Sequence, residues 1–372
     1  MRRRVITAVA IITVFTLFAL ELALSLWGLP TYFPTQQPNY NLSVSNWWTC
    51  DTAGCHYVYE AVLVACDASQ LQGRVCAVNR QGYSDADDFV WDDEFEDKPR
   101  VLLIGDSFTW GMNAEVGMSF AERLDAAFPE SIVWNAGMPG GGTHQALATF
   151  NAYAQVLRPQ LTIFGFYVND FDDNLMPIDS WLNAIDPNGN AVAIRMYEID
   201  HWENVIRYNV NDIEYFRAYW KFPPANELER VLGLTRLGSL LLRLIDTVEA
   251  GRPPDARFER REQVTRQYLE ELRNAVSQHG SEFLVLLIPG PNDIGGAGMR
   301  YQLAREIVSS LEIAHIDPID RLEAPSDYAP LPDDHWSNEG HQKISALLGD
   351  CIKAFIADGA ISDCAHVTMP GN

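Results

Sequence analysis

The chain has 372 residues, of which 47% are hydrophobic and 11% aromatic, and its formal net charge is −23 at pH 7. This composition supports a hydrophobic core and excludes an intrinsically disordered chain. The acidic balance, without any basic stripe, excludes a nucleic-acid-binding surface, because phosphates would be repelled. The length allows one large domain with additions, or two domains.

The N-terminal segment is almost wholly apolar from residue 5 to residue 29 and follows Arg2, Arg3 and Arg4. A segment of this length can span a bilayer, and its basic flank stays in the cytoplasm. A cleaved signal peptide is the alternative, but no small-x-small cleavage site precedes the aromatic and Pro-rich residues 27–38. We therefore expect an uncleaved transmembrane anchor over 1–29, with the remaining chain outside the cytoplasm, in a periplasm or at the cell surface.

The chain has six cysteines, an even number that suits disulfide formation in an exported protein. The simplest pairing joins neighbours in the sequence: Cys50–Cys55, Cys66–Cys76 and Cys351–Cys364. A zinc site is disfavoured, because no Cys-x-x-Cys is present and the spacings are irregular. Four of the six cysteines lie in residues 30–98, which we interpret as an extracytoplasmic N-terminal extension. Its acidic run, 85–97, lacks the spacing of a calcium loop and is expected to be solvated.

The segment Val101-Leu102-Leu103-Ile104 runs directly into Gly105-Asp106-Ser107. A continuous apolar run that ends in a turn signal predicts a buried strand. Gly105 allows a sharp turn, so Ser107 is expected at the carboxyl end of a central strand, where open α/β sheets place their ligands. The Gly-x-Ser-x-Gly elbow of α/β-hydrolases is absent.

Strands and helices then alternate along the chain. The periodicity predicts helices over 120–128, 146–157, 264–279, 297–311 and 344–356, and strands over 132–134, 161–168, 283–288 and 315–317. Such alternation predicts a parallel sheet covered by helices on both faces. We therefore expect residues 99–372 to form a three-layer α/β/α sandwich with a parallel, flavodoxin-like sheet.

The alternation stops between residues 171 and 260, which we interpret as an insertion that serves as a lid or cap. An Asn-Gly pair at 188–189 lies between apolar segments and indicates a β-hairpin. A strongly apolar stretch at 228–248 is expected to be helical, either as part of a cap or as core of a larger domain.

Residues suited to acyl transfer follow successive strands: Ser107, the glycine loop 137–142, Asn169, and Asp333-Asp334-His335. A serine hydroxyl is a poor nucleophile until a base takes its proton, and His335 can be that base. A carboxylate would orient the imidazole. After Pro332 an extended segment would place Asp333 beside the His335 ring and point Asp334 away. Amides of the serine, a glycine and Asn169 would bind the oxyanion.

This set of blocks resembles the SGNH hydrolase family, also called the GDSL family. Gly105-Asp106-Ser107 matches its first block, and Gly165-Phe166-Tyr167-Val168-Asn169-Asp170 is similar to its third. The resemblance implies Ser107, His335 and Asp333 as the catalytic triad, with Ser107, Gly140 and Asn169 as the oxyanion hole. Asp333-Asp334-His335-Trp336 departs from the common form with Asp three places before His, and resembles a branch that includes periplasmic polysaccharide O-acetyltransferases.

Other polar residues near these blocks are given structural roles. We expect Asp106 to tie the loop after the strand, and Asp170, Asp172 and Asp173 to begin a solvated loop. His144 and His341 lack spaced partners and are expected in surface or capping roles, so no metal is expected.

The sequence therefore predicts a membrane-anchored serine esterase that acts through an acyl-serine intermediate and needs no cofactor. Its substrate would be an ester or an acylated carbohydrate or lipid. Two alternatives stay open: an O-acyltransferase acting on envelope or exported polysaccharide, and a non-catalytic envelope scaffold. The acyl chain, the alcohol and the oligomeric state do not follow from the sequence.

Overall fold

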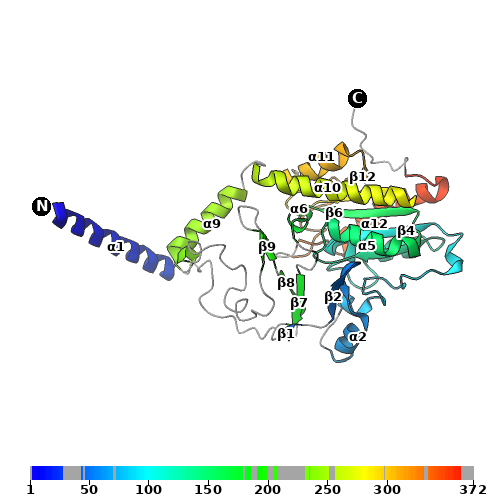
Figure 1. Cartoon of the computed structure of the whole chain (residues 1–372), viewed down its shortest axis with the longest axis horizontal. Helices are drawn as coiled ribbons and strands as arrows, with labels where there is room; N and C mark the ends of the chain where they lie inside the picture. Colours follow the sequence, from blue (N-terminus) through cyan, green and yellow to red (C-terminus); the bar gives the residue numbers. More distant parts are fainter. Residues whose placement is uncertain are drawn as a thin grey trace.

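The computed structural model describes most of the chain (Figure 1). The described residues are 2–27, 43–44, 47–69, 73–176, 178, 181–185, 191–195, 197–199, 205–207, 231–233, 235–250, 256–296, 298–330 and 334–361. The division at residues 29, 98, 171 and 260 stays a prediction.

A five-stranded parallel sheet is the centre of the molecule. Its strands are β4 (Arg100–Gly105), β5 (Ile132–Gly137), β6 (Leu161–Tyr167), β11 (Glu282–Ile288) and β12 (Ala314–Ile316). Their order across the sheet is β12-β11-β6-β4-β5, so the chain reverses its direction of travel between β4 and β6. This is the flavodoxin-like order, in which ligands bind outside the carboxyl ends of the strands at the reversal. The predicted α/β fold with a parallel sheet is confirmed.

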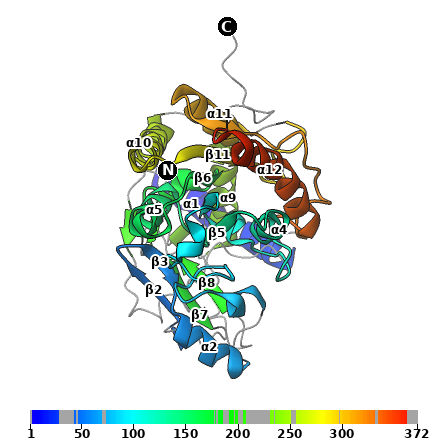
Figure 2. The same cartoon turned by 90° about the vertical axis from the view of Figure 1, so that its right-hand side faces the viewer.

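Helices cover both faces of the sheet and explain why its strands are apolar along their whole length. On one face lie α5 (Thr143–Leu157), α10 (Ala256–His279) and α11 (Met299–Ser310), and on the other α4 (Phe120–Ala127) and α12 (Asn338–Asp358). Figure 2 shows α5 and α10 on one side of the sheet and α4 and α12 on the other. Each predicted helix of this region is present, with its bounds shifted by a few residues.

The N-terminal extension is tied to the sheet domain by a disulfide-closed hairpin. It comprises β2 (Trp48–Asp51), β3 (Gly54–Tyr57), α2 (Tyr59–Asp67) and two short 3-10 helices, η1 (Gly73–Ala77) and η2 (Asp93–Phe95). The Cys50–Cys55 disulfide joins β2 to β3, and Cys66–Cys76 joins α2 to η1, as predicted. Cys351 is also disulfide-bonded, whereas its expected partner Cys364 lies outside the described residues.

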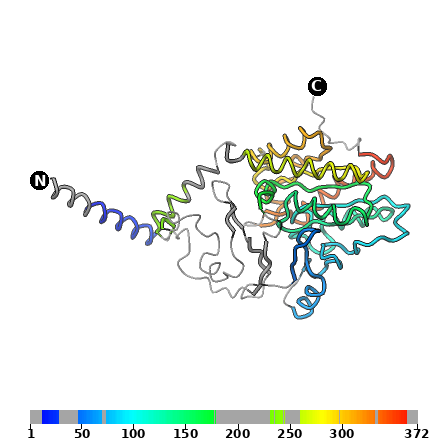
Figure 3. Tube along the Cα trace, in the orientation of Figure 1, coloured from blue at the N-terminus to red at the C-terminus, as the bar shows by residue number. Residues whose placement is uncertain are grey.

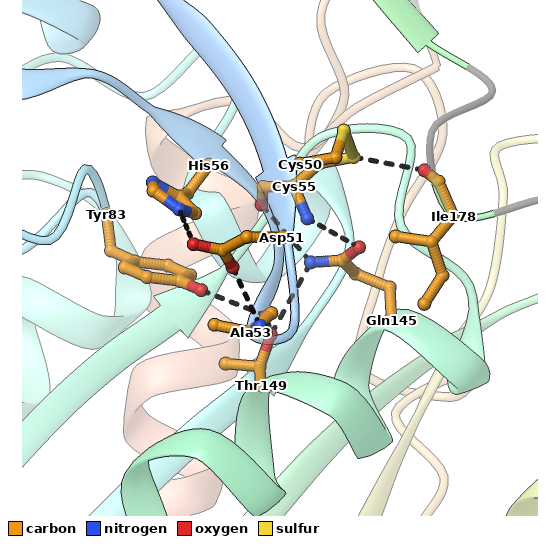
Figure 4. Close-up of a disulfide and its surroundings, with 9 residues drawn as sticks. All are labelled: Cys50, Asp51, Ala53, Cys55, His56, Tyr83, Gln145, Thr149 and Ile178. Atoms are coloured by element: carbon orange, nitrogen blue, oxygen red, sulfur yellow. Dashed lines mark hydrogen bonds and ion pairs between the residues drawn. A yellow bond between two sulfur atoms is a disulfide. The ribbon is translucent and has the colours of Figure 1, made fainter.

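The hairpin docks on α5 through polar contacts (Figure 4). The Gln145 carboxamide accepts from the Cys55 backbone N–H at 2.9 Å and donates to the Cys55 carbonyl at 3.2 Å. Thr149 donates to the Ala53 carbonyl at 3.0 Å. Gly54 has a φ of +92°, and a Cβ there would lie 2.0 Å from the Gln145 amide nitrogen. The hairpin turn therefore requires glycine, and its backbone polar groups depend on α5.

The acidic run is not wholly solvated as expected. One carboxylate oxygen of Asp85 accepts from the Asn135 backbone N–H on β5 at 2.5 Å, so this side chain faces the sheet.

The insertion contains two antiparallel strand pairs and a helix. These are β7 (Trp181–Ile185) with β8 (Ala191–Arg195), β9 (Tyr197–Ile199) with β10 (Val205–Arg207), and α9 (Arg236–Ala250). The β7–β8 pair agrees with the expected hairpin, although its turn lies outside the described residues. Strand β1 (Ser43–Val44) of the N-terminal extension pairs with β7. Extension and insertion, far apart in the sequence, thus share a three-stranded sheet.

The N-terminal helix α1 (Arg2–Leu26) extends outward from the sheet domain (Figure 3). In the described part of the chain, no helix combines the length and apolarity that crossing a membrane requires. The expected transmembrane anchor is therefore not confirmed.

Candidate active site

Ser107 is the first residue of the short helix α3 (Ser107–Trp110), which begins directly after β4. The turn depends on Gly105, whose φ is +153°; a Cβ there would lie 2.3 Å from Thr109 Oγ1 and 2.9 Å from the Gly165 carbonyl oxygen. The Asp106 carboxylate caps α3 by accepting from the Phe108 N–H at 2.9 Å. This confirms the expected structural role of Asp106 and points the start of α3 toward the carboxyl edge of the sheet.

His335 lies beside the serine, with its Nε2 2.6 Å from Ser107 Oγ. Its backbone is held by the Ala329 N–H, which donates to the His335 carbonyl at 2.8 Å. Its ring packs against Phe108, with the ring centroids 4.7 Å apart, and the same Phe108 ring contacts the fully buried Trp336 at 4.9 Å. The residue after the serine and the residue after the histidine thus fix the imidazole in place for proton transfer.

The carboxylate nearest the imidazole belongs to Asp334. Its Oδ1 lies 3.7 Å from His335 Nδ1, close enough for an ion pair but too far for a hydrogen bond. Its Oδ2 accepts from the Tyr167 hydroxyl at 2.5 Å. The expectation that Asp334 points away from the ring is wrong, because the Tyr167 hydroxyl holds its carboxylate on the side of β6. Asp333 lies outside the described residues.

The three expected oxyanion residues follow three neighbouring strands. The strand register aligns Gly105 of β4 with Gly137 of β5 and Gly165 of β6. Ser107, Gly140 and Asn169 come shortly after these glycines, so they reach the same edge of the sheet. Gly140 has a φ of +74° in the turn before α5.

Asn169 is the residue before α6 (Asp170–Asp173), a short helix at the end of β6. Its Oδ1 is buried, and none of the described residues donates to it. Buried polar atoms in proteins are almost always paired, so an unpaired amide at this edge is suited to bind a ligand.

The aspartates after Asn169 do not begin a solvated loop, contrary to expectation. Asp170 is 1% exposed and accepts from Thr143 Oγ1 at 2.7 Å, and Asp173 is equally buried. Asp172 pairs with Arg261 on α10 at 2.6 Å and with Arg300 on α11 at 2.9 Å. These contacts fix α6, and with it Asn169, against three helices. The sequence carried no sign of them, because ion pairs between distant segments leave no local pattern.

Burial controls the charges around the serine. It raises the pKa of Asp106 to about 6, although the nearby His335 opposes this shift. Burial also raises the pKa of Tyr167, and the charge of Asp334 adds to the rise. Tyr167 therefore stays a protonated hydrogen-bond donor to Asp334 at neutral pH.

His341 is buried rather than at the surface, although the expected capping role is present. Its Nδ1 accepts from the Phe120 N–H at the start of α4 at 3.3 Å, and its Nε2 lies 3.4 Å from the Met112 carbonyl oxygen. Burial lowers the pKa of His341 to about 4, so the ring is neutral at pH 7. His144 is also buried, with its pKa lowered to about 4 for the same reason.

Comparison with known proteins follows from this geometry. The family described as GDSL-like lipase/acylhydrolase matches residues 101–348, and the chain belongs to this family of serine hydrolases. No curated protein matches the chain.

Three solved structures show the range of similar proteins. A lipase/acylhydrolase from Enterococcus faecalis is 13% identical with a TM-score of 0.37, covering 68% of this chain and 96% of that one. A psychrotrophic esterase from Pseudoalteromonas sp. is 10% identical with a TM-score of 0.36, covering 69% and 98%. A two-domain esterase active on acetylated mannans is 13% identical with a TM-score of 0.36, covering 74% and 52%.

Proposed function

We propose that the protein is a serine esterase that cleaves an acyl ester through an acyl-serine intermediate. The observation that carries this proposal is the 2.6 Å contact between His335 Nε2 and Ser107 Oγ. At this distance the imidazole can take the hydroxyl proton as the oxygen attacks the ester carbonyl. The backbone N–H groups of Ser107 and Gly140 and the Asn169 amide would stabilise the oxyanion.

The intermediate collapses when the alcohol leaves, and the imidazolium returns the proton to the departing oxygen. Water then attacks the acyl-serine with the imidazole again as base, and the acid is released. The imidazolium formed in each step needs a carboxylate at Nδ1. Asp333 stays the predicted acceptor for the Nδ1 hydrogen, because Asp334 lies too far away for that bond.

The proposed location is outside the cytoplasm, attached to a membrane by the N-terminal segment. The disulfides support an oxidising compartment, because cytosolic thiols are kept reduced. The basic residues at the N-terminus followed by the apolar segment support attachment with the sheet domain outside. The substrate would be an ester or acylated carbohydrate or lipid of that compartment.

The test is an ester panel with the purified full chain, its Ser107→Ala variant and Ser345→Ala as the matched control. Ser345 is an exposed α12 residue that bonds only its own helix, so its loss should leave turnover unchanged. We expect Ser107→Ala to abolish both turnover and labelling by a fluorophosphonate probe while the circular dichroism spectrum is retained. Wild-type turnover in Ser107→Ala would overturn the proposal. A second arm adds an oligosaccharide acceptor; acyl transfer to it in preference to water would identify an O-acyltransferase instead.

A further inference from the structure

Helix α1 exposes apolar side chains around its whole circumference. Its large apolar side chains between Ile12 and Leu26, together with Trp27 directly after it, are mostly exposed, from 44% at Leu20 to 85% at Trp27. Successive positions on a helix differ by about 100°, so neighbours such as Phe15, Leu17 and Phe18 point in different directions. A soluble helix keeps a polar side toward water, whereas a helix that is apolar all round needs an apolar surrounding.

The polar groups of this helix find partners within the protein. Thr16 Oγ1 donates back to the Ile12 carbonyl at 2.9 Å. Glu21 accepts from the Arg236 N–H at 2.8 Å through Oε1 and from the Leu237 N–H at 3.0 Å through Oε2. The Arg236 guanidinium also lies 3.7 Å from the Glu21 carboxylate. The only acidic residue of the apolar segment is therefore both hydrogen-bonded and charge-paired, as an apolar medium requires.

The partners of Glu21 are the first two residues of α9, so the contact joins the insertion to the N-terminal helix. Helix α9 has its own exposed apolar side chains: Leu240 at 45%, Leu241 at 46% and Leu244 at 59%. Positions 240 and 244 are one turn apart, so these three leucines share one face of the helix. Figures 1 and 3 show α1 and α9 adjoining one another outside the sheet domain.

We propose that α1 and the exposed leucine face of α9 enter the same phospholipid bilayer, with Glu21 clamping the two helices together. A second copy of the chain would cover one side of α1, whereas lipid contacts every side. Leucines on one face of an otherwise polar helix suit the interface between headgroups and acyl chains. The inference builds on the proposed membrane location and assigns the insertion, as well as the N-terminus, to the lipid surface.

The experiment places an environment-sensitive fluorophore on α9. Leu244→Cys introduces a single thiol, because every described cysteine is in a disulfide, and labelling stoichiometry is checked by mass. Val64→Cys, 70% exposed on α2, is the matched control. Full-length protein is reconstituted in vesicles of phosphatidylcholine and phosphatidylglycerol, with or without doxyl-labelled phosphatidylcholine as quencher. We expect the quencher to at least halve the emission from position 244 and to leave position 64 unchanged.

The clamp is tested by Glu21→Ala in the Leu244→Cys background. We expect vesicle flotation through α1 to persist while the quenching at position 244 is lost. Quenching that persists in Glu21→Ala would overturn the clamp, and flotation without any quenching at 244 would overturn insertion of α9. Failure to float at all would instead count against the proposed membrane location. Fluorescence changes that depend on protein concentration without lipid would indicate a second copy as the partner and overturn the lipid assignment.

Discussion

Asn169 shows how a single residue can be assigned from its missing contacts. Its amide is buried at the carboxyl edge of the sheet, yet its Oδ1 has no donor among the described residues, while the adjacent Asp170 is held by Thr143. We expect Asn169→Ala to lower kcat by about two to three orders of magnitude, the usual cost of one oxyanion donor.

The KM of Asn169→Ala should change far less than its kcat, because the oxyanion forms only in the transition state. Steady-state kinetics on one ester separates the two parameters. Asn174→Ala is the comparison, since this asparagine bonds Thr143 and Thr265 and serves packing. An unchanged kcat in Asn169→Ala would place the residue outside the site.

The two aspartates before His335 can be separated by paired substitutions. We expect Asp333→Asn to lower kcat at least about a hundredfold, because loss of the orienting carboxylate mis-sets the imidazole tautomer. Asp334→Asn should be milder, because Asp334 acts across 3.7 Å without a hydrogen bond. Turnover of both variants on one ester, with folding checked by circular dichroism, measures the difference.

Tyr167→Phe provides the control for Asp334. It removes the hydroxyl that holds the Asp334 carboxylate, so its effect on kcat should match that of Asp334→Asn. A severe Asp334→Asn beside a mild Asp333→Asn would reverse the assignment of the orienting acid. Two mild variants would mean that another acceptor orients the imidazole.

At the scale of elements, the docking of the β2–β3 hairpin on α5 carries a stability prediction. Gln145 satisfies both backbone groups of Cys55, and the residue is buried. Gln145→Ala would leave these groups unpaired, which costs about 1–3 kcal/mol of unfolding free energy. Urea unfolding of the oxidised protein measures the loss, with the exposed Gln267→Ala on α10 as the control. Equal stability of the two variants would show that the hairpin is not held by α5.

Which elements were predictable depends on the range of the interactions that form them. Strand β4 and helix α12 follow from apolar runs and periodicity within a few residues, and the turn at Gly105 follows from Gly-Asp-Ser. Ser107 and His335 were predictable because their motifs end successive parallel strands. The pairing of β1 with β7 was not, because it joins Ser43 to Ile185 and leaves no local pattern. The burial of Asp170 and the side of the ring on which Asp334 lies depend in the same way on distant helices and on Tyr167.

At the scale of the whole molecule, acidic groups occur both at the surface and in the interior. The net charge of −23 makes the folded chain repel itself. Inside, burial raises the pKa of Asp85 to about 8 and that of Asp106 to about 6. Both groups are carboxyls whose ordinary pKa is 3.8, so each binds its proton more tightly in the folded state than in the unfolded one.

The sign of the resulting pH dependence follows directly. Between the unfolded and folded pKa values the folded state binds more protons, so the free energy of unfolding falls as pH rises. The stability is fully present below the unfolded pKa and is lost as pH rises through about 6 for Asp106 and about 8 for Asp85. One extra bound proton corresponds to a slope of about −1.4 kcal/mol per pH unit. We therefore expect the protein to be more stable in mildly acidic than in mildly alkaline solution.

Urea unfolding at several pH values between about 5 and 8, in low and in high salt, tests this expectation. Salt screens repulsion between surface charges but not the burial of Asp85, so a slope should persist in high salt. Asp85→Asn should flatten that slope by up to about 1.4 kcal/mol per pH unit. Asp97→Asn, which removes the same charge from an exposed position, should leave it unchanged. A slope that vanishes in high salt, or that survives in Asp85→Asn, would assign the pH dependence to surface repulsion or to other carboxyls.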